Sequence, residues 1–303
     1  RCNFNCWMCY VHLKENQIPE YGRELNAKEW IQIAREAKDS GTTWLCITGG
    51  EPLMHPEFEI IWKELSQMGF FITLQTNASL IRGKMAELLE QYPPRCVKIT
   101  LYGSSNEVYE KVCRVQNGFR QVDEGIQTIK GLKIPIETVS TIIKQNRQDV
   151  KKMGFYAFQN KIRWQPTAGV KTSVRNEQDK IEEIRISDFN ETVWRQQMKE
   201  RLEKHPVNIE RKPCTYCKDY RLGYWVTWNG EMRFCSFMDK PNIPVLEKGF
   251  KEAWKQLIEY EESLRWPEEC YVCEANRICF KCAGTLNAEC GNPERSAKQF
   301  CEK

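Results

Sequence analysis

The chain has 303 residues, of which 41% are hydrophobic and 28% are charged. Its 45 basic and 41 acidic side chains give a formal net charge of +4 and are dispersed along the chain, which argues against nucleic acid as the main partner. No apolar run approaches the roughly 20 residues of a membrane span. We therefore expect a cytoplasmic protein with no membrane contact and with one large or two unequal domains.

Fifteen cysteines are the most unusual feature of the composition. A secreted disulfide protein would usually be shorter and would begin with a signal peptide, and no such segment is visible. Cysteines that are spaced two residues apart are better placed to converge on a metal than to pair across loops. We therefore expect thiolates that bind metal in a reducing compartment.

The first two thirds of the chain alternate between helices and strands. Asn26 and Glu29 form a plausible capping pair at the start of a helix, which ends at Gly41. Further helices are predicted at 58–68, 80–89, 122–131 and 149–158. Short β-prone segments, predicted to be strands, lie at 43–48, 70–75, 97–101, 136–142 and 162–165. On these strand patterns, Cys46 and Cys96 are expected to be small core residues.

Strands that alternate with helices indicate a parallel sheet, and right-handed crossovers curl such a series into a barrel. The predicted fold class is α/β, with a partial (β/α)6 TIM-like barrel at residues 1–205. Its active site is expected at the C-terminal ends of the strands. Because a strand would normally lead into the first cysteine loop, we expect that residues upstream of Arg1 are missing.

The character of the chain changes near residue 205, where we place a domain boundary. Before it, residues 167–187 resemble a polar connector and 188–204 a helix. In the second domain, residues 206–303, Asn229 and Gly230 predict a tight hairpin. A helix is predicted at 248–266, and the remainder is expected to be loop built around cysteines.

A three-cysteine motif opens the chain and is the first of two that carry chemistry. Cys2, Cys6 and Cys9 lie in one short loop. Three thiolates on a four-iron cluster leave one iron open, and an open iron is a place for chemistry. A zinc site is the alternative, with His12 as the fourth ligand that zinc usually needs.

The second motif is Gly49, Gly50 and Glu51, directly after the first predicted strand. Bare glycines let a ligand approach the backbone, and a carboxylate can receive an ammonium group. The two glycines alone would equally suit a tight turn. The pairing of this motif with the three cysteines favours a cofactor site.

Together the two motifs resemble the radical S-adenosylmethionine (SAM) superfamily. The resemblance implies that the three cysteines hold a 4Fe-4S cluster, that SAM chelates its open iron, and that reductive cleavage yields a 5′-deoxyadenosyl radical. It also implies SAM contacts from the glycine loop, from the aromatic residue after the third cysteine and from polar residues near later strand ends. These residues are Tyr10, Gly49, Gly50, Glu51, Thr76, Asn77, Thr100 and Arg114.

Nine further cysteines fall in the second domain. A zinc ribbon is one reading, but so many clustered thiols would overfill one zinc site, and two iron–sulfur clusters use them better. Their spacing resembles the SPASM extension of radical SAM peptide-modifying enzymes, which holds two auxiliary 4Fe-4S clusters. The resemblance implies Cys214, Cys217, Cys235 and Cys282 for the cluster nearer the active site, and Cys270, Cys273, Cys279 and Cys301 for the outer one.

One departure from the SPASM pattern concerns the spacing before its last core cysteine. The family usually has three residues there, and here only Phe280 and Lys281 intervene. Cys290 is left over and could replace Cys301 as the final ligand.

The resemblance as a whole predicts an oxidoreductase with three 4Fe-4S clusters that acts on a peptide. The favoured reaction is thioether or carbon–carbon cross-linking of a ribosomally synthesised precursor peptide (RiPP maturation), with a flavodoxin- or ferredoxin-type protein as reductant. Formation of formylglycine, as in sulfatase maturation, is an alternative enzyme function. A non-catalytic iron–sulfur electron carrier or a zinc-binding module is the alternative from another class.

Overall fold

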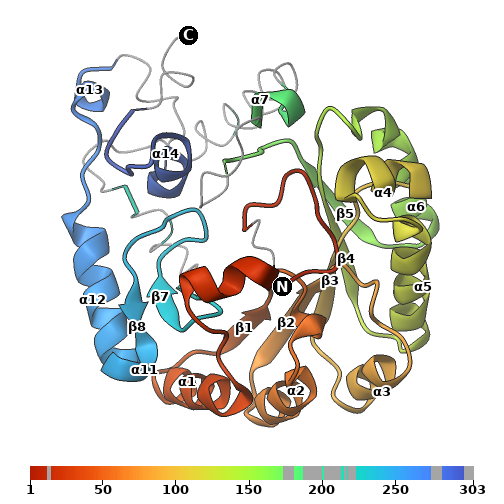
Figure 1. Cartoon of the computed structure of the whole chain (residues 1–303), viewed down its shortest axis with the longest axis horizontal. Helices are drawn as coiled ribbons and strands as arrows, with labels where there is room; N and C mark the ends of the chain where they lie inside the picture. The colour runs from red at the N-terminus through yellow and green to blue at the C-terminus, as the bar shows by residue number, and fades with distance from the viewer. Residues whose placement is uncertain are drawn as a thin grey trace. The chain divides into compact units, whose positions relative to one another are not determined.

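The computed structural model describes residues 1–11, 15–172, 181–186, 200, 213–214, 217, 223–273 and 282–296, and Figure 1 labels its elements. The chain divides into two compact units. The first comprises residues 1–170 and 180–185, and the second comprises residues 171–179 and 186–303. The domain boundary predicted near residue 205 falls outside the described residues.

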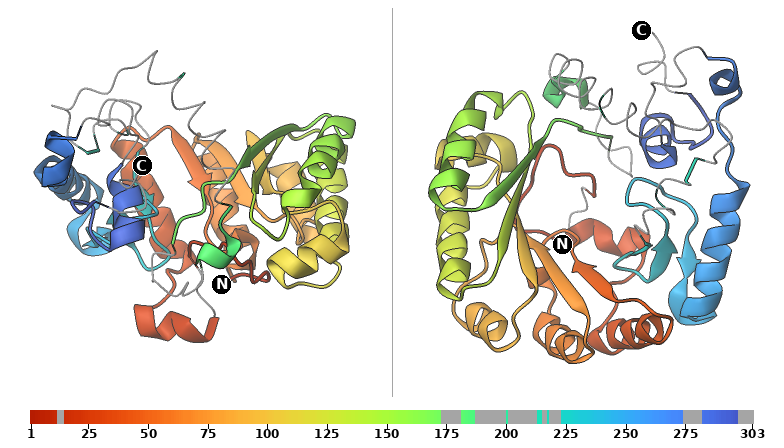
Figure 2. Two further views of the ribbon diagram at one scale, coloured as in Figure 1. Left: turned by 90° about the horizontal axis from the view of Figure 1, so that it is seen from above. Right: turned by 180° about the vertical axis from the view of Figure 1, so that it is seen from behind.

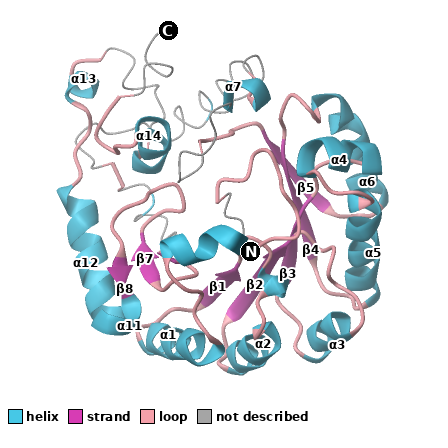
Figure 3. Ribbon diagram, in the orientation of Figure 1, coloured by secondary structure: helices cyan, strands magenta, loops and turns pink. Residues whose placement is uncertain are grey.

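A parallel sheet of five strands forms the centre of the first unit, with the strands side by side in chain order. The strands, shown in Figure 3, are β1 (Trp44–Ile47), β2 (Phe71–Thr76), β3 (Cys96–Thr100), β4 (Ile136–Thr141) and β5 (Arg163–Thr167). Each lies within two residues of its predicted position. The predicted α/β class is therefore confirmed.

Five α-helices connect the strands, and together with α1, which precedes β1, they lie along one face of the sheet (Figures 1 and 2). These helices are α1 (Ala27–Asp39), α2 (Phe58–Gln67), α3 (Lys84–Gln91), α4 (Asn106–Cys113), α5 (Gly118–Gly131) and α6 (Val150–Gln159). Trp62, Leu89 and Ile126 on these helices are fully buried against Leu74 and Ile99 of the sheet. Each such side chain contributes roughly 1.5–3 kcal/mol through its burial.

The other face of the sheet, which we call the inner face, carries the alternate residues of each strand. Its members include Trp44, Cys46, Phe71, Gln75, Cys96, Lys98, Glu137 and Arg163. The expectation that Cys46 and Cys96 are core residues is wrong. Cys46 is exposed and Cys96 is half-buried, because the alternation places both opposite the helix-covered side.

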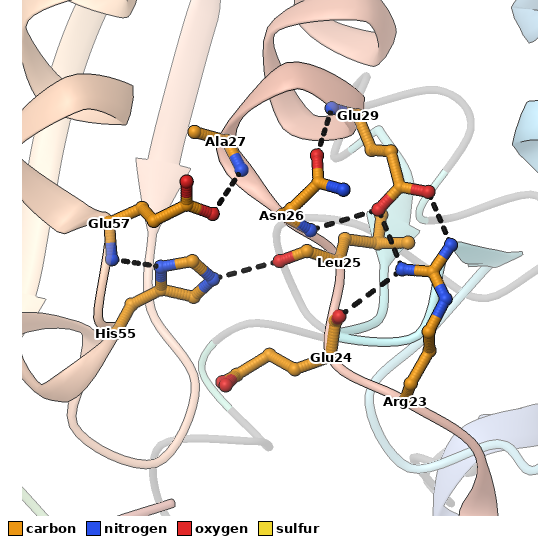
Figure 4. A network of polar contacts seen from close by, with 8 residues as sticks. All are labelled: Arg23, Glu24, Leu25, Asn26, Ala27, Glu29, His55 and Glu57. Carbon is orange, nitrogen blue, oxygen red and sulfur yellow. Dashed lines mark hydrogen bonds and ion pairs between the residues drawn. The ribbon is translucent and has the colours of Figure 1, made fainter.

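The predicted capping pair at α1 is confirmed and belongs to a larger hydrogen-bond network (Figure 4). The Asn26 side chain accepts from the Glu29 N–H at 3.0 Å, and the Glu29 carboxylate accepts from the Asn26 N–H at 2.9 Å. His55 Nδ1 accepts from the Glu57 N–H at 3.1 Å, so its Nε2 carries the proton and donates to the Leu25 carbonyl at 2.9 Å. His55 thus joins the loop after β1 to the chain before α1.

Short helices fill several of the connections in the first unit. They are the 3-10 helices η1 (Glu15–Tyr21), η2 (Pro52–Met54) and η3 (Arg147–Asp149), and the single turn α7 (Ile181–Ile184). The turn α7 lies within residues 167–187, which the sequence presents as a polar connector. The helix predicted at 188–204 falls almost wholly outside the described residues.

The second unit contains a small antiparallel sheet of β6 (Trp225–Val226), β7 (Glu231–Arg233) and β8 (Ile243–Pro244). The hairpin predicted at Asn229 and Gly230 is confirmed. The Thr227 N–H donates to the Glu231 carbonyl at 2.9 Å, and Gly230 takes a φ of +86°, which favours glycine.

Four helices complete the described part of the second unit. They are α11 (Val245–Lys248), α12 (Phe250–Ser263), α13 (Glu268–Tyr271) and α14 (Ala283–Cys290). The expectation that the chain beyond residue 266 is loop is wrong at α13 and at α14. Cys282 caps α14 with its sulfur atom, and Gly291 ends this helix at a φ of +68°. Among the helices described here, none has the length and apolar character to cross a membrane.

Candidate active site

The start of the three-cysteine loop is hydrogen-bonded to the residues that follow β1 and β2. The Glu51 N–H donates to the Arg1 carbonyl at 3.0 Å. The Asn77 side-chain amide donates to Asn3 Oδ1 at 2.8 Å, and Asn3 Nδ2 donates to Ser79 Oγ at 2.8 Å. These contacts hold the loop at the C-terminal ends of the strands, where the sequence places the active site.

The middle of the loop is bonded to the end of helix α4. The Asn5 N–H donates to the Cys113 carbonyl at 3.0 Å, and the Trp7 N–H donates to the Val112 carbonyl at 3.1 Å. The last carbonyls of a helix lack partners within the helix, so the loop supplies donors that α4 needs. Arg114, the next residue, places its guanidinium 3.7 Å from the centre of the Trp7 ring.

Apolar residues between the cysteines anchor the loop in the core. Phe4 and Met8 are each 7% exposed, and Phe4 meets Tyr109 edge-on with ring centres 6.2 Å apart. The Cys9 N–H donates to the Cys6 carbonyl at 3.2 Å and closes a turn between these two cysteines. With this anchoring, the backbone that carries the three thiols is fixed before any metal binds.

The surroundings of these thiols oppose ionisation in the metal-free chain. Burial, followed by the charges of Cys6, Glu51 and Cys9, raises the pKa of Cys2 to about 12. Contact with the Cys113 thiol, and then burial, raises the pKa of Cys6 well above its ordinary value. Iron binding must therefore displace protons here, and a cationic cluster reverses these shifts.

Glu51 joins the end of β1 to the end of β2. Its carboxylate accepts from the Thr76 hydroxyl at 2.7 Å, from the Asn77 N–H at 2.8 Å and from the Leu53 N–H at 3.2 Å. Only 2% of Glu51 is exposed, and this burial raises the pKa of its carboxyl to about 7 against the hydrogen bonds. An ammonium group placed beside it would favour the ionised form.

Glycine is needed at each of the two positions before Glu51, but for different structural reasons. A Cβ atom on Gly50 would lie 2.1 Å from the carbonyl oxygen of Arg1, so only glycine lets the cysteine loop pass this close. Gly49 has open space around it, but its φ of +150° is one that side chains with a Cβ rarely adopt. Both glycines therefore serve the junction between the loop and β1.

The other residues in the implied SAM set lie on the same loop or beside the same strand ends. Tyr10 is half-buried and directly follows Cys9, and Thr100 is the half-buried last residue of β3. Arg114 caps α4 with a φ of +53° and packs on the cysteine loop as described above. His12, the fourth zinc ligand in the alternative reading, lies outside the described residues.

Four cysteines of the second unit, Cys214, Cys217, Cys235 and Cys282, lie within electrostatic reach of one another. Burial raises the pKa of the Cys214 thiol, and the neighbouring Glu261, Cys217, Cys282 and Cys235 groups raise it further. Burial, followed by Cys282 and Cys235, raises the pKa of Cys217 to about 11. These are the four cysteines that the resemblance assigns to the nearer auxiliary cluster. Glu261, which is 3% exposed, carries no sequence signal that would place it beside them.

The start of helix α14 is built closely around two of these sulfur atoms. Cys282 Sγ accepts from the Thr285 N–H at 3.3 Å and lies 3.1 Å from the Thr285 hydroxyl. Cys235 Sγ accepts from the Phe237 N–H at 3.4 Å, and a Cβ on Gly284 would lie 2.8 Å from it. Hydrogen-bond donors around thiolates are typical of iron–sulfur sites, so this donor set fits such a cluster.

The set implied for the outer cluster is only partly described. Cys270 is buried in α13 and Cys273 is exposed beyond it, while Cys279 and Cys301 lie outside the described residues. Cys290, the possible replacement, ends α14 and is half-buried. All cysteines that the structure describes are free thiols. Within these same residues, no three His, Cys, Asp or Glu side chains lie close enough to hold a single metal ion.

Comparison with known sequences gives one family and several distant relatives. The family model for the Radical SAM superfamily matches residues 1–157. An AdoMet-dependent heme synthase of Methanosarcina barkeri is 21% identical over 320 residues, which cover 96% of this chain and 90% of that protein. A "Probable GTP 3',8-cyclase" of Pyrobaculum aerophilum is 27% identical over 156 residues, or 50% of this chain. This match spans about half, 49%, of the cyclase.

Comparison with solved structures gives likenesses that cover the whole chain. Streptococcus suis SuiB bound to precursor peptide SuiA matches with a TM-score of 0.70 and 18% identity, over 100% of this chain and 74% of SuiB. The protein anSMEcpe with bound AdoMet matches with a TM-score of 0.67 and 16% identity, over 99% of this chain and 91% of its own. At these identities the likeness shows a shared fold.

Proposed function

The chain belongs to the radical SAM superfamily, and we propose that it is a peptide-modifying member in which Cys2, Cys6 and Cys9 hold the SAM-cleaving cluster. One observation carries this proposal. The loop that presents the three thiols is hydrogen-bonded at the C-terminal ends of β1 and β2, next to the buried carboxylate of Glu51. Three thiols beside a carboxylate are the groups that an open four-iron cluster and the amine of SAM require.

The residues of this chain are proposed to hold the cluster, to orient SAM and to shield the site from water. Bound there, the 4Fe-4S cluster and SAM supply a 5′-deoxyadenosyl radical that removes a hydrogen atom from a substrate carbon. Asn5 and Trp7 fix the loop backbone on α4, while Phe4 and Met8 fix it in the core. Glu51 is almost fully shielded from water, which strengthens its attraction to an ammonium group.

The thiols of Cys214, Cys217, Cys235 and Cys282 are proposed to hold one auxiliary 4Fe-4S cluster, and the partly described outer set is proposed to hold another. A cross-link between two residues of a peptide removes two hydrogens. One leaves as the hydrogen atom taken by the deoxyadenosyl radical, and the other leaves as a proton and an electron. A cluster held by Cys214, Cys217, Cys235 and Cys282 would accept that electron, and a flavodoxin or ferredoxin is the proposed source of the electron that would cleave SAM.

Support for a peptide substrate comes from the solved likenesses. SuiB was solved with its precursor peptide, and anSMEcpe was solved with AdoMet and the peptide Kp18Cys. Cross-linking predicts a product lighter by two hydrogens with a bond between two residues. Formylglycine formation would instead change one residue and yield an aldehyde, so fragmentation of the product peptide separates the two reactions.

SAM cleavage is the direct test. The reconstituted protein, under oxygen-free reducing conditions with SAM, should contain about twelve irons per chain and release 5′-deoxyadenosine. Cys6→Ala should abolish that release and lose about a third of the iron. Cys46→Ala, which removes an exposed thiol from the inner face of the sheet, is the matched control and should do neither. If the Cys6→Ala protein still cleaves SAM, the proposed cluster ligands are wrong.

A second candidate substrate is a tetrapyrrole. It rests on the match to the AdoMet-dependent heme synthase, which extends over 96% of this chain rather than over its first half alone. The same assay distinguishes the two candidates if it is run once with a candidate precursor peptide and once with a carboxylate-bearing iron tetrapyrrole. If the tetrapyrrole is consumed and the peptide is unchanged, the substrate is a tetrapyrrole and the peptide proposal is wrong.

A further inference from the structure

A row of polar and charged residues crosses the inner face of the sheet. In the strand registers, Lys98 of β3 stands opposite Gln75 of β2 on one side and opposite Glu137 of β4 on the other. Glu137 in turn stands opposite Arg163 of β5. Neighbouring strands lie about 4.8 Å apart, so these four side chains project from one continuous line.

The charges in this row are unequally paired. Arg163 Nη1 lies 3.2 Å from Glu137 Oε1, so the one carboxylate of the row is engaged by the arginine. Lys98 is half-buried. It forms no hydrogen bond or ion pair with any residue that the structure describes. The row therefore has a net charge of +1, because its single carboxylate is paired with Arg163. The ammonium of Lys98 supplies the remaining positive charge.

The thiols of Cys46 and Cys96 lie on the same face of the sheet as Lys98, by the alternation and register of the strands. Burial raises the pKa of both thiols, and the positive charge of Lys98 acts in the opposite direction on both. Cys46 lies on β1 and Cys96 on β3. The alternation of β3 thus places Lys98 on the inner face, and its charge acts on a thiol of β1 as well as on one of its own strand.

The position of Lys98 along β3 relates it to the candidate active site. It precedes Thr100, the last residue of the strand, by two positions. Two residues of a strand span about 7 Å, so Lys98 lies one row below the edge at which the cysteine loop is bound. A group held by Lys98 would leave the rest of its molecule free to reach that edge.

We propose that Lys98, with the Arg163–Glu137 pair beside it, binds a carboxylate of the substrate on the inner face of the sheet. A lone ammonium on a half-buried surface favours a carboxylate, because a charge-assisted hydrogen bond replaces the water that binding removes. This inference rests on the proposed function and narrows it to substrates that carry a carboxylate, from a Glu or Asp side chain or from a chain terminus.

Peptide binding to the reconstituted, oxygen-free protein tests the inference without requiring turnover. The probes are a tetraglutamate peptide blocked at both ends, a tetraglutamine peptide blocked at both ends, and tetraglutamine with a free C-terminal carboxylate. Calorimetry should show that Lys98→Met weakens binding of the tetraglutamate peptide by at least about fivefold and that Lys98→Arg restores it. Lys28→Met, which removes an exposed ammonium from α1, is the matched control and should change nothing.

Glu137→Gln is a second variant, and its expected effect is tighter binding, which a misfolded protein would not show. It raises the charge of the row from one to two, so the tetraglutamate peptide should bind about threefold more tightly. The free-terminus probe shows whether a chain end serves as well as a side chain. Equal binding of the blocked glutamate and glutamine peptides, or unchanged binding by Lys98→Met, overturns the inference.

The proposed function fails separately, in the assay of 5′-deoxyadenosine release. Lys98-dependent binding by a protein that cannot cleave SAM would leave the inference standing and remove the function. If the protein cleaves SAM but its peptide binding does not depend on Lys98, the proposed function stands and the inference about Lys98 is wrong.

Discussion

The backbone N–H of Glu51 donates a 3.0 Å hydrogen bond to the carbonyl oxygen of Arg1. This single bond joins the residue before the first cysteine to the glycine loop after β1. The two motifs that identify the superfamily are therefore parts of one structural unit. Gly50 stands at their junction, because its hydrogen atom occupies the place where a side chain would meet Arg1.

Gly50→Ala should prevent the protein from binding the cluster proposed at Cys2, Cys6 and Cys9. The new Cβ would lie 2.1 Å from the Arg1 carbonyl oxygen, so the cysteine loop must move. We expect about a third of the iron to be lost, measured as iron per chain after reconstitution. Gly131→Ala at the end of α5 is the control, since nothing lies within 4 Å of its added Cβ. Full iron in the Gly50→Ala protein would contradict the role assigned to this glycine.

Glu51 should make the metal-free protein less stable as the pH rises. Its folded-state pKa of about 7 lies above the ordinary value of 4.5. Its contribution to stability is therefore fully present below pH 4.5 and is lost as the pH rises towards 7. The loss is on the order of 3 kcal/mol in the free energy of unfolding.

Urea unfolding of the metal-free protein at pH 5 and at pH 8 measures this effect. In Glu51→Gln the difference between the two pH values should shrink by on the order of 3 kcal/mol. An unchanged pH difference would show that Glu51 ionises normally in the folded chain.

Local periodicity is why the fold was predictable. Each predicted strand alternates between the core and the inner face, and α2, α3, α5 and α6 lie near the helices expected there, whereas α4 (Asn106–Cys113) was not predicted. The errors arose because the apolar character of a residue does not show which face of the sheet it occupies. A cysteine in a β-prone segment suits either face, and the register that puts Cys46 on the inner face depends on which side the helices cover.

The active-site prediction was limited in a different way. Spacing alone indicates which cysteines act together, because a short loop constrains where its thiols can go. It says nothing about residues that the topology brings to the loop from far along the chain. Cys113 at the end of α4 and Asn77 after β2 are of this kind, and Glu261 of α12 is the equivalent case beside Cys214 in the second unit. Only the Asn77 position carried a signal, through the resemblance to the family.

Thr285 should tune the reduction potential of the auxiliary cluster proposed at Cys282. Its hydroxyl lies 3.1 Å from Cys282 Sγ, and a hydrogen bond to a thiolate stabilises the reduced, more negative cluster. Thr285→Val removes the hydroxyl but keeps the shape, so the potential should fall by on the order of 30–60 mV in an EPR-monitored redox titration. Thr285→Ser keeps the hydroxyl and should stay near the wild-type value. Equal potentials for all three proteins would exclude this hydrogen bond.

Cys113 offers the sharpest test of the claim that only three thiols hold the first cluster. Its thiol is fully buried and contacts that of Cys6, while its carbonyl accepts the Asn5 N–H. If Cys113 only donates a hydrogen bond to the Cys6 thiolate, Cys113→Ala should keep its full iron content and change only the potential of that cluster.

A ligand would behave differently under the same substitution. If Cys113→Ala lost about a third of the iron, as Cys6→Ala is expected to do, Cys113 would itself bind the cluster. A fourth protein thiolate would then occupy the iron on which SAM has to dock. Iron analysis of these two variants side by side therefore decides whether the first site has room for the cofactor that the proposed chemistry requires.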